Sequence, residues 1–408
     1  MTEAPAGAAP AKRARPPSIP LLFAMMFAGQ LGTTIYLPGL PDIARDLDTS
    51  ISAAQSMVAI YLGAFGFAQL VMGPLSDRFG RRPVMMTGLA IFAIASAVCA
   101  SAPDISTLLV ARVFQAVGAC ATMVVGRAMI RDTAEGVAAA QAMAWLAIAI
   151  GIGPAVAPFA GGFIVSWFGW QASFTAIGLV VSVVLGWVVV SLEETLPPEM
   201  RNPPKASQLL ITYVRLIRSP VFLGYSMIVA FASGAMQAYL TSVPIVFIVL
   251  MDVPLELFGF YVMIMPTLYI IASYVSRQLS FHIPVDRIVL IGCAMSATGG
   301  LLQVILGLDG VTTPPPVLFA FAISNFGTGL VLSIGYAQAL NTVSPSIAGQ
   351  ASALSGFLHM GWGAGLSFVV AQLHHTSSLQ LGISQMTTTW LGAATALYLI
   401  FVVKRARG

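Results

Sequence analysis

Charged residues that could do chemistry are concentrated in one short stretch, GPLSDRFGRRPV, at residues 73–84. Only 8% of the 408 residues are charged, yet Asp77, Arg78, Arg81 and Arg82 fall within six positions. A basic loop of this kind can fix the orientation of neighbouring membrane segments, because cytoplasmic loops of membrane proteins are rich in arginine and lysine. That role would explain the arginines but neither the aspartate nor the glycines, so the stretch predicts a second function.

Three further candidates lie inside apolar sequence. Arg112 and Gln115 stand one helical turn apart in RVFQAVGACA and therefore share a helix face. Arg112 falls about seven residues into its apolar run, roughly 10 Å deep at 1.5 Å per residue. An arginine at that depth costs about 2.5–3.5 kcal/mol, which favours a functional role over a side chain that extends to the outer interface. A histidine side chain ordinarily titrates near neutral pH, so His359 could carry a proton or simply form a hydrogen bond across a helix interface.

The composition indicates what holds these residues. The chain is 58% hydrophobic, whereas a soluble domain is about half apolar and about a quarter charged. A membrane-spanning helix needs about 20 apolar residues. The stretches that approach this standard are 18–40, 53–75, 84–102, 105–126, 138–165, 170–191, 221–249, 256–276, 288–307, 315–340, 347–372 and 380–403. The sequence therefore predicts an all-α polytopic membrane protein with twelve transmembrane helices in two six-helix pseudo-repeats.

The basic residues predict the orientation. If the N-terminus is cytoplasmic, all of the 19 lysines and arginines except Arg45 and Arg112 fall in cytoplasmic segments, as the positive-inside rule requires. Both termini are then cytoplasmic. The net charge of +4 follows from this topology and gives no support for nucleic-acid binding.

The hydrophilic interruptions predict the domain organisation. We expect a cytoplasmic N-terminal tail (1–17), an N-terminal six-helix bundle (18–191), a cytoplasmic linker (192–220), a C-terminal six-helix bundle (221–403) and a cytoplasmic C-terminal tail (404–408). The other connections are too short for a soluble catalytic domain. The chain has no G-x-x-x-x-G-K-[ST] phosphate loop, which argues against ATP-driven pumping. We expect neither a cofactor nor a metal.

The stretch at 73–84 resembles the loop between helices 2 and 3 of the major facilitator superfamily, which usually reads G-x-L-a-D-r-x-G-r-[rk]. In that family the aspartate is part of a charged latch, held near the N-terminus of helix 11 and neighbouring arginines, that locks the cytoplasmic side shut in the outward-open state. The resemblance implies a latch made of Gly73, Asp77, Arg78, Gly80, Arg81 and Arg82. Gly73 is expected to permit close approach of the second helix, and Gly80 to permit a tight turn.

Two more stretches carry the resemblance. Arg112, Gln115 and Gly118 match the helix-4 pattern R-x-x-Q-[GA]-x-G. Residues 151–162 resemble the exporter-associated helix-5 motif G-x-x-x-G-P-x-x-G-P-x-x-G-G, with Ala157 in place of one glycine. The matching residues are Gly153, Pro154, Pro158, Gly161 and Gly162. Small residues let helices approach closely in lipid, and the prolines allow a bend. The motif implies export rather than import.

The first span narrows the resemblance. Residues 29–47, GQLGTTIYLPGLPDIARDL, resemble the bicyclomycin/chloramphenicol resistance group of drug exporters, in which the first helix typically ends T-D-M-Y-L-P-A-L-P. Tyr36, Leu37 and Pro38 are kept, but Thr34 occupies the place of the acid. The resemblance implies proton antiport, whereas this chain has no clearly intramembrane carboxylate for a proton relay.

These observations predict a monomeric secondary active transporter in a bacterial cytoplasmic (inner) membrane. It would export small amphipathic drug-like compounds, such as phenicols or bicyclomycin-like molecules, by alternating access, with the proton as coupling ion and the lipid bilayer as solvent. Candidate residues for a substrate cavity are Gln30, Thr33, Tyr36, Tyr61, Gln237, Tyr239, Asn325, Tyr336 and Trp362. An exporter of one endogenous metabolite or siderophore is the alternative. A transport-dead sensor or a membrane enzyme is more remote, because no paired acids or Ser-His set is present.

The orientation predicts the outcome of a labelling experiment. A cysteine placed at Asp309 should react with a membrane-impermeant thiol reagent from outside the cell, and one placed at Lys205 should not. The reverse pattern would overturn the orientation and the cytoplasmic position of Asp77.

Overall fold

The structure is a computed structural model that describes residues 16–201, 206–344, 347–373 and 377–403. The described residues form helices and connecting segments, and 12 of the helices are long and apolar enough to cross a membrane. The predicted all-α class and the twelve predicted spans are therefore confirmed. The expected tails at 1–17 and 404–408 lie almost wholly outside the described residues.

The helices of the first half of the chain are α1 (Ile19–Thr34), α2 (Leu40–Asp46), α3 (Ile51–Phe79), α4 (Arg81–Ala100), α5 (Ile105–Thr133), α6 (Gly136–Phe168) and α7 (Trp170–Ser191). Those of the second half are α8 (Ala206–Ile217), α9 (Pro220–Pro244), α10 (Leu255–Leu279), α11 (Val285–Leu308), α12 (Pro314–Asn341), α13 (Ala348–Gln372) and α14 (Leu379–Leu397). Two π-helical turns, Ile245–Leu250 and Tyr398–Val403, extend α9 and α14. The first span is interrupted, because a short 3-10 turn at Leu37–Gly39 separates α1 from α2.

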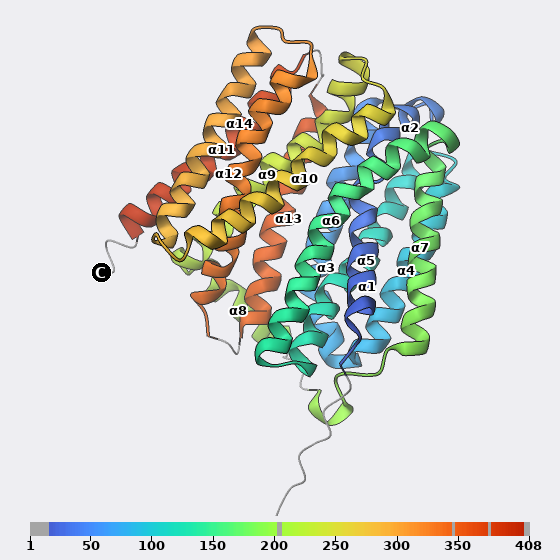
Figure 1. Ribbon diagram of the computed structural model, residues 1–408. Helices are drawn as coiled ribbons and strands as arrows, with labels where there is room; N and C mark the ends of the chain where they lie inside the picture. The colour runs from blue at the N-terminus through green and yellow to red at the C-terminus, as the bar shows by residue number, and fades with distance from the viewer. Residues whose placement is uncertain (1–15, 202–205, 345–346, 374–376, 404–408) are drawn as a thin grey trace, which may run out of the picture.

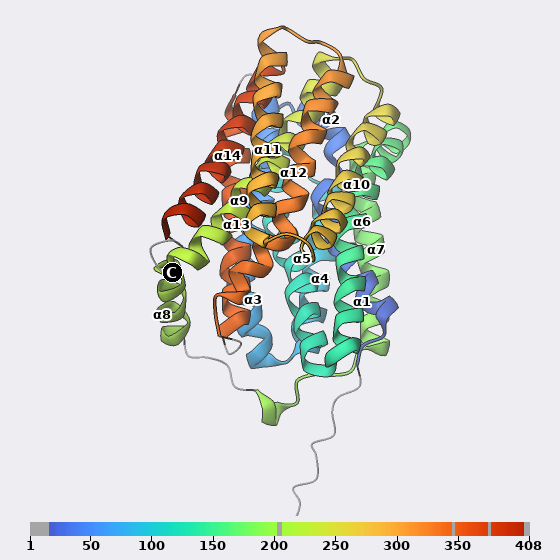
Figure 2. The ribbon, with the colours of Figure 1, turned by 60° about the vertical axis from the view of Figure 1, so that its left-hand side comes forward.

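The two halves of the chain form two groups of helices (Figure 1). We call the end that carries residues 73–84 and the start of α1 the loop end, and the opposite end, which carries α2, the α2 end. The C-terminal group leans away from the N-terminal group toward the loop end (Figure 1). Within the predicted linker, α8 lies beside the lower part of the C-terminal group (Figure 2), and its Leu210 and Ile211 are exposed.

Local side chains define where the helices begin. At α3, the Ser50 hydroxyl accepts a hydrogen bond from the backbone N–H of Ala53, at 3.1 Å. At α5, the Asp104 carboxylate accepts one from the backbone N–H of Thr107, at 2.8 Å. Such caps satisfy backbone donors that have no partner inside the helix. The bond to Thr107 also lowers the pKa of Asp104, because it stabilises the ionised carboxylate.

The two halves are in direct contact at the α2 end. The Gln55 side-chain amide on α3 donates a hydrogen bond to the backbone carbonyl of Thr241 on α9, at 2.8 Å. A Cβ added at Gly162 on α6 would lie 2.7 Å from the carbonyl oxygen of Leu255 on α10. Leu37, beside α2, is 1% exposed. These contacts close the α2 end.

The loop end is more open than the α2 end. Residues of α6 near the loop end are more exposed than those near the α2 end. Met143, Ala144 and Trp145 are all exposed. Consecutive helical residues point about 100° apart, so three exposed neighbours mean that this part of α6 packs on a single side. Gly161 and Gly162, near the other end of α6, are both buried. In Figure 1, α6 and α10 diverge toward the loop end.

Glycines of the helix-5 motif place α6 against its neighbours. A Cβ at Gly161 would overlap the carbonyl oxygen of Ile35, and one at Gly153 would overlap the side chain of Gln30. Both glycines therefore let α6 approach α1 closely, as small residues do in membrane proteins. Helix α6 continues through Pro154 and Pro158.

This packing predicts opposite effects for two matched substitutions. Gly161→Ala should lower the melting temperature of the purified protein, because overpacking costs about 1–3 kcal/mol. Gly186→Ala, on α7, should leave it unchanged or raise it slightly, because no atom lies within 4 Å of the added Cβ and alanine is the better helix former. Thermal unfolding in detergent tests this, and equal melting temperatures for the two variants would contradict it.

Candidate functional site

A cavity of about 510 Å³ lies between the two halves. Its wall comes from α1, α3, α5 and α6 on one side and α9, α10, α12 and α13 on the other. Most of the wall is apolar, with a few polar side chains. Cavities of this volume and character are typical of sites for small amphipathic molecules.

Several of the residues singled out by the sequence lie on the wall of this cavity. They are Gln30, Thr33, Thr34, Tyr61, Arg112, Pro154, Gln237, Tyr336 and His359. They come from both halves of the chain, so a ligand in the cavity would contact both.

Four of the predicted cavity residues are not on the wall of this cavity. Tyr239 stacks on Phe321, with ring centroids 3.7 Å apart. The Asn325 amide donates to the backbone carbonyl of Met265, at 2.6 Å. Trp362 donates to the Thr388 hydroxyl, at 2.9 Å. The fourth residue, Tyr36, packs over the Arg112 side chain instead. The first three side chains join helices to one another, which is why they are unavailable to a ligand.

Arg112 is fully buried between α1, α3 and α4, which excludes a side chain that extends to the outer interface. Its Nη1 donates to the backbone carbonyl of Gly32, at 2.7 Å, and to the side-chain oxygen of Gln115. The guanidinium carbon lies 4.3 Å from the ring centroid of Tyr36 and 4.1 Å from that of Tyr61. The aromatic faces stabilise the cation, because they carry a partial negative charge.

Gln115 supports Arg112 and does not itself line the cavity. Its amide nitrogen donates to the Ser96 hydroxyl on α4, at 2.8 Å. Ser96 in turn donates to the Phe92 carbonyl, at 2.7 Å. This chain fixes the amide so that its oxygen faces the guanidinium. The shared helix face predicted from the spacing of Arg112 and Gln115 is where this contact forms.

No carboxylate faces Arg112 across the cavity. Among the described residues, the wall holds Arg112, Arg127 and His359 but neither an aspartate nor a glutamate. The Thr34 hydroxyl, at the position of the expected acid, makes no hydrogen bond within the described chain. The same holds for Nε and Nη2 of Arg112. The cavity is therefore a positively charged site.

Arg127 is the charged wall residue that the sequence analysis missed. We placed it in a cytoplasmic loop, but α5 continues to Thr133, so Arg127 lies within the helix and on the cavity wall. The expectation that Arg127 lies in a connecting loop was therefore wrong. The available signal was the absence of any proline or strong helix-stop sequence between residues 126 and 134.

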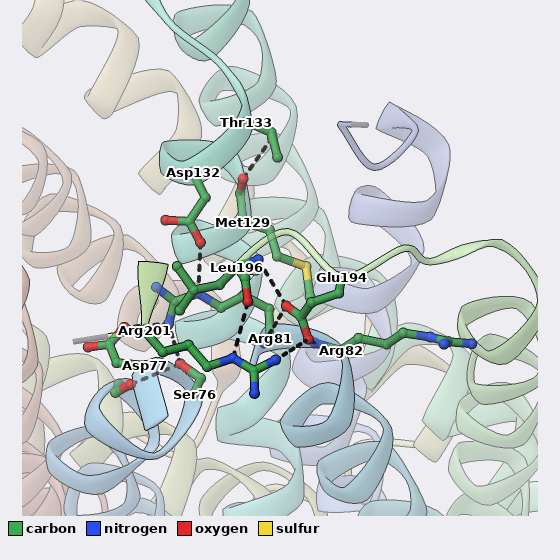
Figure 3. A network of polar contacts seen from close by, with 11 residues as sticks. Ser76, Asp77, Arg81, Arg82, Met129, Asp132, Thr133, Glu194, Leu196 and Arg201 are labelled. Carbon is green, nitrogen blue, oxygen red and sulfur yellow. Dashed lines mark hydrogen bonds and ion pairs between the residues drawn. The ribbon is translucent and has the colours of Figure 1, made fainter. Parts of the chain in front are cut away.

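The loop between α3 and α4 is built around Arg81 (Figure 3). The Arg81 side chain is 3% exposed and forms ion pairs with Asp77, at 2.6 Å, and Asp132, at 2.8 Å. It also donates to the Ser76 hydroxyl, at 2.6 Å. All these partners belong to the N-terminal half. Asp132, at the end of α5, connects the loop to the helix that carries Arg112.

A carboxylate from the linker binds the start of α4. Glu194 accepts hydrogen bonds from the backbone N–H of Arg81, at 2.8 Å, and of Arg82, at 3.3 Å (Figure 3). A carboxylate suits this place, because a helix N-terminus presents unpaired N–H groups and a partial positive charge. Arg201 Nη2 lies 3.8 Å from Glu194 Oε2, the oxygen that also accepts from Arg82. The sequence analysis missed Glu194, whose one signal was its position in the linker just after the sixth span.

The glycines of the predicted latch have different outcomes. Gly80 has φ of +100°, and a Cβ there would overlap the Glu194 carboxylate, so the expected tight turn is present. At Gly73 no atom lies within 4 Å of an added Cβ. The expected close approach at Gly73 is therefore wrong for this conformation, in which the loop end is open.

The two remaining arginines of the stretch lie at the surface of the loop end. Arg78 lies over the Phe79 ring, 5.4 Å from its centroid. Arg82 donates to the backbone carbonyl of Val189 on α7, at 2.9 Å. Asp77, 32% exposed, is the carboxylate of the stretch that remains accessible. Its expected partner, the N-terminus of the eleventh span, would be the start of α13.

The comparison with known proteins decides the family. Residues 22–368 match the family described as the Major Facilitator Superfamily. The chain belongs to this superfamily. It is therefore a multi-pass membrane protein of a transporter family, and the resemblance drawn from its motifs is confirmed.

Individual relatives agree with this assignment. The chain is 27% identical to a bicyclomycin resistance protein homolog of Haemophilus influenzae over 84% of its length and 85% of that protein. It is 28% identical to multidrug resistance protein D of Escherichia coli, over 95% and 98% of the two chains. Among solved structures, a crystal structure of a POT peptide transporter superposes with a TM-score of 0.77 at 13% identity, covering 96% and 95%. This last likeness concerns the fold.

The arrangement at the loop end predicts the effect of removing one charge. Asp77→Asn should reduce the transport rate at least about fivefold, the scale of a typical coupling between conformations, because the latch would lose its carboxylate. The amount of protein in the membrane should not change, because the arginines remain. The matched control is Asp104→Asn at the α2 end, where asparagine also caps a helix well. The measurement is uptake or efflux in cells. Near-normal transport by Asp77→Asn would mean that residues 73–84 serve only to orient the neighbouring membrane segments.

Proposed function

We propose that this protein is a secondary active exporter of small amphipathic drug-like compounds across the bacterial cytoplasmic membrane. The observation that carries the proposal is the cavity between the two halves. It is closed at the α2 end, and α6 and α10 diverge at the loop end. With the loop end toward the cytoplasm, a compound would enter from that side. The halves would then rock to open the α2 end, as in alternating access.

The direction of transport rests on two supports. The relatives include proteins named for multidrug and bicyclomycin resistance. The glycines of the helix-5 motif pack α6 against α1 and α10 as close small-residue contacts. Because no large side chains interlock at these contacts, the helices can slide past one another. The names of the relatives and the resemblance of residues 151–162 to an exporter-associated motif both favour export.

Cells lacking their own drug efflux pumps provide the test. Cells that express the protein should accumulate less chloramphenicol than cells that express Asp77→Asn at the same membrane level. They should also survive a higher concentration of the antibiotic. Equal accumulation of chloramphenicol and of a panel of chemically different antibiotics in the two strains would contradict the proposal.

We propose that export is coupled to proton antiport, and we expect the dependence of transport on a pH gradient to be weak. A coupled exporter needs a group that gains and loses a proton between the two states, and the cavity wall offers His359 but no carboxylate. Arg112 cannot fill this role, because a guanidinium stays protonated. Arg127 lies near His359 and carries the positive charge in that part of the wall.

We therefore expect Thr34→Asp to steepen the dependence of transport on an imposed pH gradient, because it places a carboxylate on the cavity wall that also carries Arg112. Thr34→Asn is the matched control and should leave the dependence unchanged. The measurement is flux into proteoliposomes at a series of imposed gradients. A steep dependence in the unmodified protein that survives His359→Gln would contradict this account of coupling.

A further inference from the structure

The polar atoms around Arg112 that lack partners are all able to donate hydrogen bonds. They are Nε and Nη2 of Arg112 and the hydroxyls of Thr34, Tyr36 and Tyr61, none of which has a partner among the described residues. Arg112, Thr34 and Tyr61 are on the cavity wall, and each of the four residues is at least 97% buried. Unpaired buried donors are costly, so a group of them points to a missing acceptor.

The charges around these donors indicate that the missing acceptor is negatively charged. Arg112 is a buried cation, and the described cavity wall holds no aspartate or glutamate to balance it. The nearby aromatic rings compensate in part, but a buried charge that has no counter-ion remains destabilising. Arg127 adds a second positive charge farther along the same wall. An anion would satisfy both the charge and the donors.

The shape of the site narrows the anion to one chemical class. A guanidinium presents its N–H groups in a planar fork that matches a carboxylate. The rest of the wall is mostly apolar, with side chains such as Leu62, Phe65 and Met123. A compound that satisfies both parts has one carboxylate and an apolar body.

We propose that the cavity binds amphipathic organic carboxylates, with the acid group against Arg112, Thr34 and Tyr61 and the body against the apolar wall. This inference rests on the proposed export function and names one further substrate class for it, besides neutral compounds such as chloramphenicol. The threonine at position 34 is part of this site, since an aspartate there would place a negative charge on the same wall as Arg112 and compete with the substrate's carboxylate.

A matched pair of probes tests the proposal in the purified protein in lipid nanodiscs. At pH 7, 1-naphthylacetate is ionised and 1-naphthylacetamide is neutral, and the two are otherwise alike. Saturable binding of radiolabelled naphthylacetate should be at least about tenfold tighter than binding of the amide, a difference set by one charge-assisted contact. Arg112→Gln should remove that preference, and so should Thr34→Asp, which keeps the arginine. The control, Arg277→Gln, alters an exposed residue outside the cavity wall and should bind like the unmodified protein.

The outcomes separate this inference from the export proposal. Equal affinity for the acid and the amide would overturn the carboxylate site, and export of neutral chloramphenicol would then stand alone. Absence of saturable naphthylacetate binding, with chloride raising the melting temperature only when Arg112 is present, would also overturn it, because the site would belong to an inorganic anion. Arginine-dependent binding of naphthylacetate without flux of any probe into proteoliposomes would support the site and contradict the export function.

Discussion

The burial of one positive charge constrains the N-terminal half more than any other feature. Arg112 has no carboxylate partner among the described residues, so the surrounding helices must supply its stabilisation. The carbonyl of Gly32 accepts its hydrogen bond from α1, and Gln115, held by Ser96, fixes it from α4 and α5. A Cβ at Gly32 would lie 3.1 Å from both the Phe92 ring and the Tyr61 hydroxyl. The approach of α1 to this charge therefore depends on a glycine, and the geometry of four helices follows from it.

A bundle fixed in this way makes movement between the halves the natural route for transport. The contacts at the α2 end are ones that can separate: the Gln55 amide on a backbone carbonyl, and a close approach of Gly162 to Leu255. At the loop end, the Asp77 carboxylate pairs inside its own half through Arg81. The same carboxylate is partly exposed and lies where the start of α13 could meet it in another state. The two ends thus differ in which contacts are made.

The sequence predicted the twelve spans well, because about 20 apolar residues in a row are a strong signal. It predicted the faces of the helices poorly. In a soluble protein the buried face is the apolar one, but lipid is as apolar as a helix interface, so Asn325 and Trp362 carry no mark that distinguishes packing from a cavity. Arg112 and Gln115 could be paired from their spacing alone. Glu194 could not be placed, since its contact with the start of α4 depends on the path of the linker.

The central claim is that the cavity between the halves is the transport path and opens alternately at its two ends. The most direct measurement is flux of chloramphenicol into proteoliposomes carrying a protein with cysteines at Gln55 and Thr241, joined by a short cleavable thiol reagent. The account predicts that joining these positions holds the α2 end closed and stops transport, and that cleaving the reagent restores it. Undiminished flux through the joined protein would contradict the account.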